Sequence, residues 1–583
     1  MSVAAALPAG ASVPRTGARL LAERMAALGV ERLHLYPGGT IMPTLHAWIE
    51  LGRPYLVARH EQGAGYAALA AARLRRVPQV AMVTSGPGVT NLLGVVADAY
   101  YDSTPLVVLA GQVGTADLTG RKGVRQRGFQ EVPTPDLVAP IAKACLRPWR
   151  PEELAEAFDR AFELARDGRP GPVVIDLPMD VQRREVSAEP AIAPIPAAPP
   201  LREPAAAAVA LLGQLLAQSE RPVLLAGQGV LQAGVGACHA LRRLAERLGA
   251  PVATSLLGVG AIPGDHPLCL GYVGHTGSGS ANRAMQRADL LVALGSRLDV
   301  RQTGTRTDDF VPAGRIVRID VDAAELAASR VRVDLALQAD VGRTLEATLA
   351  TLSGPGATRT APWLETIARW REELPLDGYP SGAGCHPAGL LRALDRMTRG
   401  RRAVVVTGVG HHQQWVARHM TFDAPRRVLL TSGGHGAMGY DLPSAVGAAL
   451  ARPDDLVLCV VGDGSFQINM QELGTIAEYG LPVKIVVVDN QRLAMVSQFQ
   501  KVAFGSDPST GDRARFDFAG FARLYGLPAS EARCDAEVDG AIEALLAAPG
   551  AALLHATVDP ACDVVPMLLA GQTPDAMWPW HRP

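Results

Sequence analysis

The chain has 583 residues, of which 48% are hydrophobic and 19% are charged. At roughly 150 residues per domain, this length predicts three or four domains with cores of their own. The 56 basic and 57 acidic residues nearly cancel, which argues against binding of nucleic acid or of an anionic membrane through overall charge.

The seven cysteines lie far apart, and no two of them form a CxxC pair. This pattern argues against a disulfide framework or a zinc site and favours a reducing compartment. The N-terminal residues include Pro8 and Pro14 and no basic residue before Arg15, unlike a secretory signal. No stretch reaches the roughly 20 apolar residues that span a bilayer. We therefore expect a cytoplasmic protein that is not inserted in a membrane.

Along the chain, short continuous apolar runs alternate with helical segments, a pattern typical of buried parallel strands in α/β domains. Helical segments are expected at residues 19–28, 64–73 and 467–479. The expected strands cover residues 32–36, 80–84, 105–110, 173–176, 222–226, 290–294, 316–320, 404–407, 457–461 and 484–488.

The alternation stops at a Pro- and Ala-rich stretch and again at a stretch of weak pattern, and both interruptions indicate linkers. They predict an α/β protein of three doubly wound domains, each with a parallel sheet. The predicted order is a disordered tail at 1–13, a first domain at 14–186, a linker at 187–204, a second domain at 205–352, a linker at 353–385, a third domain at 386–560 and a C-terminal tail at 561–583.

The clearest chemical signal lies in the predicted third domain. Strand 457–461 runs into Gly462-Asp463-Gly464-Ser465, and the next strand runs into Asp489-Asn490. One carboxylate and one amide oxygen at adjacent strand ends suit Mg²⁺ that also bridges a diphosphate. Two glycine turns without a ligand are the alternative, which the pairing of Asp463 with Asn490 disfavours.

In the predicted first domain, the stretch Arg59-His60-Glu61-Gln62-Gly63 precedes the helix at 64–73. A glutamate at a helix N-terminus often only compensates the helix dipole. In a chain that also has a magnesium–diphosphate site, it could serve thiamine diphosphate (ThDP), which needs a carboxylate against N1′ of its aminopyrimidine ring. That contact favours the imino tautomer, whose N4′ removes the C2 proton of the thiazolium ring.

From Tyr36 to Met567 the chain resembles the catalytic subunit of acetolactate synthase. The matching stretches are RHEQG at 59–63, TSGPGVTNL at 84–92, FQE at 129–131, GRPGPVVIDLP at 168–178, AMGYDLPSAVG at 437–447, GDGSF at 462–466 and DNQRLAMV at 489–496. The resemblance implies a ThDP- and Mg²⁺-dependent enzyme of branched-chain amino acid biosynthesis. Such an enzyme decarboxylates pyruvate and ligates the hydroxyethyl carbanion to a second 2-oxo acid.

The resemblance also implies ThDP at the subunit interface of a homodimer or homotetramer, with Glu61 from one chain and the diphosphate contacts from the other. The implied catalytic residues are Glu61, Phe129 and Gln130. The implied metal ligands are Asp463, Asn490 and the backbone of Arg492. Further implied ThDP contacts are Pro37, Pro87, Asn91, Val409, Gly410, His411, His412, Gly436, Met438, Gly464, Ser465, Leu493 and Met495.

In the same family the central domain binds FAD that takes no part in net redox chemistry. The implied FAD contacts are Arg169, Gly227, Gln228, Gly229, Leu256, Leu257, Gly295, Arg297, Asp299, Arg301, Asp320 and Asp340. A plain strand-end turn is the alternative for the glycines. Arg301 also matches the arginine that meets the carboxylate of the second 2-oxo acid, which a guanidinium fork binds with two hydrogen bonds. The implied substrate-binding residues are Arg301, Phe499, Met495 and Met179.

Several residues near the expected pocket depart from the family. The tryptophan linked to preference for 2-oxobutanoate over pyruvate is Phe499, and a lysine is Met179. His275, His411 and His435 replace a methionine, a glutamine and a leucine, and they could titrate near neutral pH. Extra residues lie within 119–127.

These departures leave alternatives open. One is a related ThDP carboligase or decarboxylase with a different donor or acceptor, in a specialised pathway. A flavin-dependent pyruvate oxidase is another. A catalytically silent scaffold is disfavoured by the intact Glu61, Asp463 and Asn490. Whether a separate small regulatory subunit is a partner stays open in the sequence.

Overall fold

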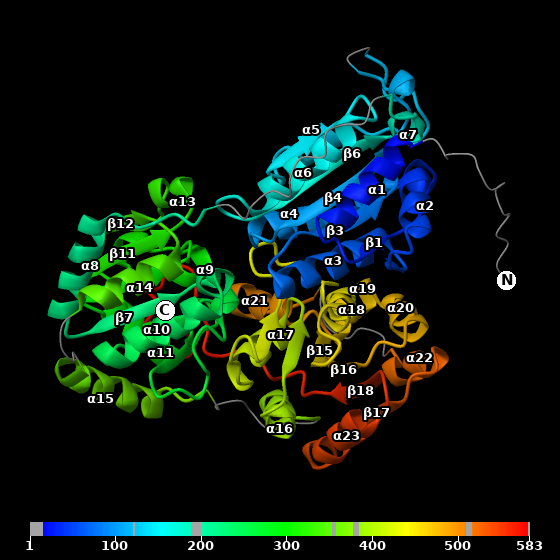
Figure 1. Cartoon of the computed structure of the whole chain (residues 1–583). Helices are drawn as coiled ribbons and strands as arrows, with labels where there is room; N and C mark the ends of the chain where they lie inside the picture. The colour runs from blue at the N-terminus through cyan, green and yellow to red at the C-terminus, as the bar shows by residue number, and fades with distance from the viewer. Residues whose placement is uncertain are drawn as a thin grey trace. The chain divides into compact units, whose positions relative to one another are not determined.

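Three α/β domains, each with a six-stranded parallel sheet and covering helices, make up the described part of the chain (Figure 1). This confirms the predicted fold class. The computed structural model describes residues 15–120, 123–187, 200–352, 357–376, 384–508 and 516–580. They fall into two units, one within residues 1–199 and the other within 200–583. The predicted disordered tail at 1–13 and most of the linker at 187–204 lie outside the described residues.

The first unit contains the first sheet, with the strand order β2-β1-β3-β4-β6-β5. Its strands are β1 (Leu33–Leu35), β2 (Tyr55–Val57), β3 (Gln79–Val83), β4 (Leu106–Gln112), β5 (Ala144–Leu146) and β6 (Pro172–Pro178). Its α-helices are α1 (Gly17–Ala27), α2 (Met42–Glu50), α3 (Glu61–Arg75), α4 (Pro87–Tyr101), α5 (Thr134–Val138), α6 (Glu153–Arg166) and α7 (Met179–Arg183). The strand order reverses between β1 and β3. Ligands of open α/β sheets bind beyond the carboxyl ends of the strands at such a switch point.

The second unit begins with the second sheet, in the order β12-β11-β10-β7-β8-β9. Its strands are β7 (Pro222–Ala226), β8 (Val252–Thr254), β9 (Cys269–Tyr272), β10 (Leu290–Leu294), β11 (Arg315–Asp320) and β12 (Leu335–Gln338). Its α-helices are α8 (Ala206–Gln218), α9 (Gln228–Ala233), α10 (Val235–Leu248), α11 (Gly279–Arg287), α12 (Val300–Thr303), α13 (Ala323–Ala327), α14 (Val341–Thr351) and α15 (Ala357–Glu373). Counted from β7 as strand 1, the order is the 3-2-1-4-5-6 arrangement of dinucleotide-binding folds, with its switch point between β7 and β10.

The third sheet, β14-β13-β15-β16-β18-β17, repeats the arrangement of the first and has its switch point between β13 and β15. Its strands are β13 (Ala403–Thr407), β14 (Arg427–Leu430), β15 (Leu456–Gly462), β16 (Val483–Asp489), β17 (Ala529–Ala532) and β18 (Ala552–Thr557). Its α-helices are α16 (Pro387–Thr398), α17 (His411–His419), α18 (Asp441–Ala451), α19 (Asp463–Ile468), α20 (Glu472–Glu478), α21 (Ala494–Phe504), α22 (Phe518–Leu524) and α23 (Asp535–Ala547).

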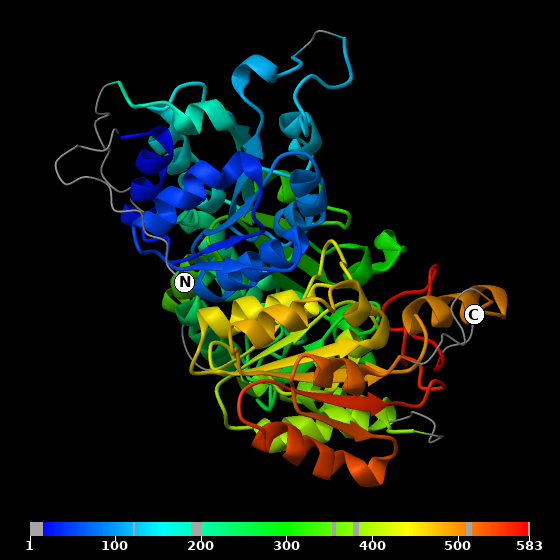
Figure 2. The ribbon, with the colours of Figure 1, turned by 90° about the vertical axis from the view of Figure 1, so that its right-hand side faces the viewer.

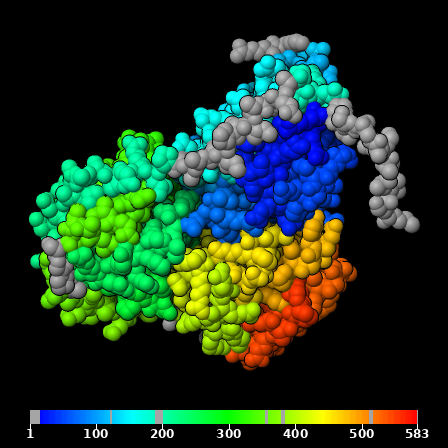
Figure 3. All heavy atoms as spheres, in the orientation of Figure 1, coloured from blue at the N-terminus to red at the C-terminus, as the bar shows by residue number. Residues whose placement is uncertain are grey.

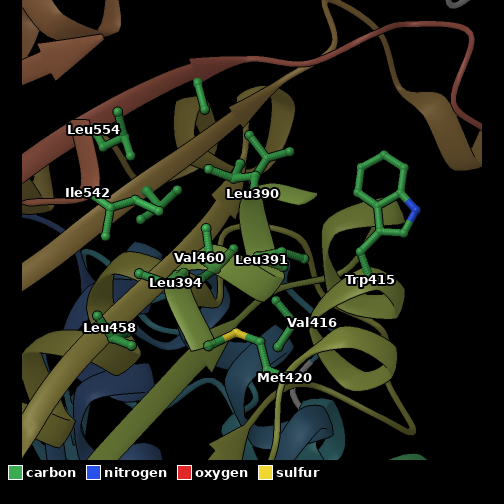
Figure 4. Close-up of a cluster of buried hydrophobic side chains, with 14 of the residues drawn as sticks. Leu390, Leu391, Leu394, Trp415, Val416, Met420, Leu458, Val460, Ile542 and Leu554 are labelled. Atoms are coloured by element: carbon green, nitrogen blue, oxygen red, sulfur yellow. The ribbon is translucent and has the colours of Figure 1, made fainter. Parts of the chain in front are cut away.

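The core of the third domain shows why these segments fold as they do. In Figure 2, α16 and α23 lie on one side of the third sheet and α18 lies on the other. Helix α16 has leucines spaced so that they face the sheet, and Figure 4 shows Leu391 and Leu394 beside Val460 of β15. Each such buried side chain stabilises the fold by roughly 1.5–3 kcal/mol.

The second and third domains contact each other within the second unit (Figure 3). The hydroxyl of Tyr272, at the end of β9, donates to the side chain of Gln414 on α17 (2.8 Å). The guanidinium of Arg418 on α17 donates to the carbonyl of Thr276 (2.8 Å). After β18 the chain returns to the second domain, where Arg287 pairs with Asp575. These contacts place the C-terminal segment beside both domains.

Two predicted features differ from the structure. The helical segment expected at 467–479 is two helices, α19 and α20, because the side chain of Asn469 donates to the carbonyl of Gly439 (2.6 Å) where the first helix ends. The stretch 353–385, expected to be a linker, contains α15. Trp363 and Ile367 of this helix are buried in the core of the second domain.

Helix length also bears on the membrane prediction. In the ranges that the structure describes, no helix is both long enough and apolar enough to cross a lipid bilayer.

Candidate active site

Asp463 and Asn490 lie at the carboxyl edge of the third sheet, beside its switch point. Strands β15 and β16 pair in parallel as far as Gly462 and Val488, so both side chains follow adjacent strand ends. Asp463 is 6% exposed and Asn490 is 7% exposed. Oδ1 of Asn490 accepts a hydrogen bond from the backbone N–H of Arg492 (3.3 Å), which orients the amide. Two oxygen donors therefore meet at one edge, as a Mg²⁺ site requires.

Carboxylates alone do not make up this site. In the described ranges, no group of three or more His, Cys, Asp or Glu side chains could hold a metal ion. The neighbouring Asp489 is already engaged, because its carboxylate accepts from the N–H of Gln491 (3.0 Å) and contacts Nε2 of His555 (2.9 Å). One carboxylate with one amide suits Mg²⁺, which keeps water and phosphate oxygens as its other ligands.

Glycines after β13 and at the end of β15 form a backbone cradle at the same edge. A Cβ atom on Gly408 would lie 2.2 Å from Oδ1 of Asp441, and one on Gly462 would lie 2.8 Å from Nδ1 of His412. Gly410, with φ of +151°, precedes the first residue of α17. Nε2 of His412 is buried without a hydrogen-bond partner among the described residues. Backbone N–H groups at a helix N-terminus bind phosphate well, so the cradle fits a diphosphate.

The loop before α18 brings Met438 to this edge. A Cβ atom on Gly464 would lie 2.8 Å from Leu493 and 3.4 Å from Cε of Met438, so both side chains flank the turn after β15. The backbone N–H of Gly436 donates to Oγ of Ser432 (3.0 Å), which fixes the start of the loop. The structure therefore brings together Met438 and Leu493, two of the residues predicted to contact ThDP.

The hydroxyl of Ser465 is engaged within the protein. It donates to the carboxylate of Asp441 and accepts from the N–H of Gly439 (2.8 Å). The predicted contact between Ser465 and ThDP would therefore be made by the backbone of Ser465. Asp441 was not singled out from the sequence, although it is fully buried and holds Ser465. The sequence feature that could have pointed to Asp441 is a charged residue in an otherwise apolar helical segment.

Burial keeps two of the three unexpected histidines neutral. Burial and the nearby Arg301 and Arg418 lower the pKa of His275 to about 4. Burial lowers the pKa of His411 to about 3. The prediction that these two rings titrate near neutral pH is therefore wrong, because a buried imidazolium is costly. The third, His435, is exposed.

We expect the free energy of unfolding to fall as the pH is lowered from 7 to 5. Burial lowers the pKa of His34 and His275 to about 4 and that of His411 and His419 to about 3. In the unfolded chain each ring binds a proton near pH 6.5. Stability is therefore complete above pH 6.5 and decreases below it, by up to about 1.4 kcal/mol per pH unit for each ring.

Thermal unfolding at pH 7 and pH 5 measures this effect. The variant His419→Leu should flatten the pH dependence, because it removes one of the buried rings that binds a proton only in the unfolded chain. A midpoint that is the same at both pH values would contradict neutral buried imidazoles.

In the first unit, Glu61 is the first residue of α3 and is 6% exposed. Its Oε2 accepts a hydrogen bond from Nδ2 of Asn91 on α4 (3.0 Å) and lies 3.8 Å from Nε2 of His60. The structure therefore joins Glu61 to Asn91, which the sequence predicted as a separate ThDP contact. A buried carboxyl group held by a neutral amide is suited to share a proton with a ligand.

The other predicted ThDP and catalytic residues of the first unit gather near the switch point of the first sheet. Pro37 follows β1, and Pro87 begins α4 after β3. Gly86 has φ of +62°, and a Cβ atom there would lie 2.9 Å from Cβ of Gln130. The loop of Gln130 thus packs against the turn after β3. Phe129 beside it is 85% exposed.

Glu131 holds the base of the loop that contains the extra residues 119–127. Its carboxylate accepts hydrogen bonds from the backbone N–H of Thr119 (2.5 Å), Arg127 (3.0 Å) and Gly128 (3.4 Å). Partial burial would raise the pKa of Glu131, but these hydrogen bonds outweigh it and lower the pKa. Glu131 therefore anchors this loop, a role not assigned from the sequence. Residues 121 and 122 lie outside the described residues.

At the switch point of the second sheet, the backbones of the strand ends come very close together. A Cβ atom on Gly227 would lie 2.1 Å from the carbonyl oxygen of Gly295, and one on Gly229 would lie 2.7 Å from its Cα. Gly295 has φ of +57°. No side chain fits between these turns, so the glycines are a structural requirement. The turns lie where dinucleotides bind in this strand order.

The remaining residues predicted to contact FAD are spread over this edge. Asp299 caps α12 and pairs with Arg297 (2.9 Å), and Asp340 caps α14. Asp320 ends β11 and accepts from the N–H of Asp322 (3.0 Å). Gln228 begins α9, and Leu256 and Leu257 follow β8 in a short 3₁₀ helix. Arg169 and the predicted substrate contact Met179 belong to the first unit.

Two residues that depart from the family touch each other. The rings of His275 and Phe499 stack with centroids 5.4 Å apart and an interplanar angle of 20°. The backbone N–H of His275 donates to the carbonyl of Arg301 (2.5 Å), and its carbonyl accepts from Leu568 (2.7 Å). The predicted substrate contact Met495 lies on α21, four residues before Phe499. Three of the residues predicted to bind substrate thus lie close together in the second unit: Arg301, Met495 and Phe499.

Comparison with protein families matches all three domains. Residues 15–138 match the "Thiamine pyrophosphate enzyme, N-terminal TPP binding domain". Residues 209–348 match the central domain of the same enzymes, and residues 408–556 match their C-terminal TPP binding domain.

Curated relatives match nearly the whole chain. The probable acetolactate synthase large subunit of Methanocaldococcus jannaschii is 37% identical, over 95% of this chain and 94% of its own length. The large subunit of acetolactate synthase isozyme 1 of Escherichia coli is 36% identical, over 95% and 96%. The chloroplastic acetolactate synthase 1 of Zea mays is also 36% identical, over 96% and 88%.

Proposed function

The chain belongs to the acetolactate synthase large-subunit family of thiamine pyrophosphate enzymes, and from this membership we propose that it forms acetolactate and CO₂ from two molecules of pyruvate. One observation carries the proposal: Asp463 and Asn490 meet at the edge of the third sheet next to the glycine cradle. That edge provides both a metal site and a phosphate site, which a diphosphate cofactor needs together.

We assign the anchoring of the cofactor to the third domain. Asp463, Asn490 and the backbone of Arg492 would hold Mg²⁺, and the backbone around Gly410 would hold the diphosphate. Met438 and Leu493 would support the thiazolium ring, because both flank the turn at Gly464. When bound, ThDP supplies the electron sink for decarboxylation of a 2-oxo acid.

We assign proton transfer at the aminopyrimidine to Glu61. Its carboxyl group is buried and is held in place by Asn91 (3.0 Å), so its second oxygen can face N1′ of the ring. Phe129 and Gln130 would border the substrate from the neighbouring loop. Arg301 would bind the carboxylate of the acceptor, since its guanidinium is exposed beside His275.

The assembly and location are part of the proposal. The family resemblance supports a homodimer or homotetramer in which one chain supplies Glu61 and the other supplies the Mg²⁺ site. The relatives named as large subunits support a separate small regulatory subunit as a further partner. The scattered cysteines, none of which is in a disulfide, fit the expected cytoplasmic location.

FAD is a second proposed cofactor. The strand order of the second sheet and the close glycine turns at Gly227, Gly229 and Gly295 support a dinucleotide at that edge. The purified protein should therefore release a compound with the mass and visible absorbance of FAD. Purified protein without a flavin, and unable to take up added FAD, would contradict this assignment.

The pairing of His275 with Phe499 supports the second candidate, a related ThDP carboligase or decarboxylase with a different acceptor or donor. A neutral imidazole offers one hydrogen-bond donor and one acceptor where an apolar side chain would offer none. A polar acceptor substrate would therefore bind more tightly with His275 than with an apolar side chain at this position.

Incubation of the purified protein with pyruvate, Mg²⁺ and ThDP tests the proposed function. Acetolactate should form and should be detectable as acetoin after decarboxylation in acid. Release of CO₂ from another 2-oxo acid, without acetolactate from pyruvate, would favour the second candidate. Binding of ThDP without release of CO₂ from any 2-oxo acid would contradict both.

Replacing Phe499 by Trp is expected to raise the preference for 2-oxobutanoate over pyruvate as acceptor by about 10-fold, the effect of one methylene group in a pocket. Phe499 is 41% exposed and stacks on His275, so a larger ring there would reshape the acceptor side of the site. The product ratio with both acceptors present measures it. Phe504→Trp at the end of the same helix is the control, because Phe504 is 81% exposed. An unchanged ratio in Phe499→Trp would mean that Phe499 does not contact the acceptor.

A further inference from the structure

A buried chain of hydrogen bonds connects the second domain to the proposed diphosphate site. Oε1 of Gln414 accepts hydrogen bonds from the hydroxyl of Thr276 (2.5 Å) and from the hydroxyl of Tyr272 (2.8 Å), and Nε2 of Gln414 donates to Oε1 of Gln413 (2.7 Å). Nε2 of Gln413 donates to the hydroxyl of Thr431 (2.7 Å), which in turn points to the carbonyl of Gly408 (3.4 Å). In each of these bonds the donor is nearer to the second domain and the acceptor is nearer to the end of β13. Such chains polarise their members and strengthen one another.

A branch of this chain reaches the loop before α18. Nε2 of Gln413 also donates to the carbonyl of Ser432 (3.0 Å). The hydroxyl of Ser432 accepts from the backbone N–H of Gly436 and of Ala437 (3.0 Å each). Gln413 thus bonds directly to Thr431 and Ser432, and it is linked to the segment ending at Gly408 through the hydroxyl of Thr431.

Burial makes the chain sensitive to the loss of any one link. Thr276, Gln414, Gln413 and Thr431 are each at most 4% exposed, so water cannot replace a lost partner. An unsatisfied buried donor or acceptor costs more than an average hydrogen bond gains, and the surrounding backbone moves to reduce that cost. Arg418 fixes the far end, because its guanidinium donates to the carbonyl of Thr276 (2.8 Å).

We propose that Thr276, Gln414 and Gln413 are positioning residues, which set the backbone after β13 and the loop at 432–437 for binding of the ThDP diphosphate. This inference rests on the proposed function. It makes the affinity for ThDP depend on two hydroxyl groups of the second domain, those of Tyr272 and Thr276, although that domain supplies no proposed ThDP ligand.

Titration of the full-length protein with ThDP at saturating Mg²⁺, followed by tryptophan fluorescence, tests the proposal. The double variant Tyr272→Phe/Thr276→Val removes both hydroxyls that donate to Oε1 of Gln414 and should weaken ThDP binding by about fivefold or more, the lower end of usual coupling between sites. Each single variant leaves one donor to this oxygen and should weaken binding less. Gln414→Met should weaken binding by a factor similar to that of the double variant. Adding Gln414→Met to the double variant should weaken binding no further, because the same chain is already cut.

Gln286→Met is the matched control, since Gln286 is a buried glutamine of the same unit whose side chain bonds to the backbone of Asp309 and Val311. It should lower the thermal midpoint without changing ThDP affinity. Unchanged affinity in Tyr272→Phe/Thr276→Val, or equal losses in that variant and in Gln286→Met, would overturn the proposal. A wild type that binds no ThDP would overturn the proposed function and this inference with it.

Discussion

Replacing Glu61 by Gln is expected to stop exchange of the C2 proton of bound ThDP with deuterium and to lower acetolactate formation by about 10²–10⁴-fold, the range for loss of an acid–base group. Glutamine has the same shape but cannot share a proton with N1′. Since the amide oxygen of a glutamine can still accept the hydrogen bond from Nδ2 of Asn91, the variant should keep its fold. Proton NMR of ThDP after acid quench at successive times measures the exchange.

Glu153→Gln is the control for this variant. Glu153 is the first residue of α6, as Glu61 is of α3, but its carboxylate accepts from the backbone N–H of Trp149 (2.8 Å) and pairs with Arg150. Glu153→Gln should change the free energy of unfolding slightly and should leave the exchange of the C2 proton unchanged. Exchange at the wild-type rate in Glu61→Gln, with ThDP bound, would remove Glu61 from the proposed mechanism.

Replacing Asp463 by Ala is expected to weaken ThDP binding in the presence of Mg²⁺ by about 100-fold or more, at least the effect of losing a residue that only supports a metal ligand. Asp463 is the one carboxylate among the proposed metal ligands, so the variant would leave an amide and a backbone oxygen. Calorimetric titration with ThDP at fixed Mg²⁺ measures the loss. Higher Mg²⁺ should restore part of the affinity.

Asp395→Asn is the control for a buried carboxylate of the same domain. Asp395 accepts from the N–H of Thr421 (2.9 Å) and pairs with Arg399 and Arg427, so the variant should unfold at a lower temperature but bind ThDP normally. Equal affinities of Asp463→Ala and the wild type would show that the diphosphate is anchored elsewhere.

Most central strands could be predicted from the sequence, with β8 and β18 as exceptions, and the edge strands could not. The runs at 222–226 and 290–294 match β7 and β10 because both faces of these neighbouring strands are buried, which leaves an unbroken apolar run. The short edge strands β5, β12 and β17 have partly exposed residues and no such run. Strand β18 was missed although it is central, because His555 interrupts its apolar residues. In the folded protein, Nε2 of His555 pairs with the carboxylate of Asp489 (2.9 Å), so the polar ring has a partner on the adjacent strand β16.

The same distinction holds for the site. The meeting of Asp463 and Asn490 followed from the sequence, because adjacent parallel strands end at one edge of a sheet. The stacking of His275 on Phe499 and the bond from Thr276 to Gln414 did not, because they depend on how two domains pack. No periodic pattern in either segment indicates which partner a buried polar side chain will find.

The most direct test of the account is the structure of the assembled protein crystallised with Mg²⁺ and ThDP. We expect Mg²⁺ at Asp463 and Asn490, the diphosphate at the same edge of the third sheet, and N1′ of the aminopyrimidine within hydrogen-bonding distance of a Glu61 carboxylate. Density for ThDP with its diphosphate away from the third sheet, or with N1′ facing a group other than Glu61, would contradict it.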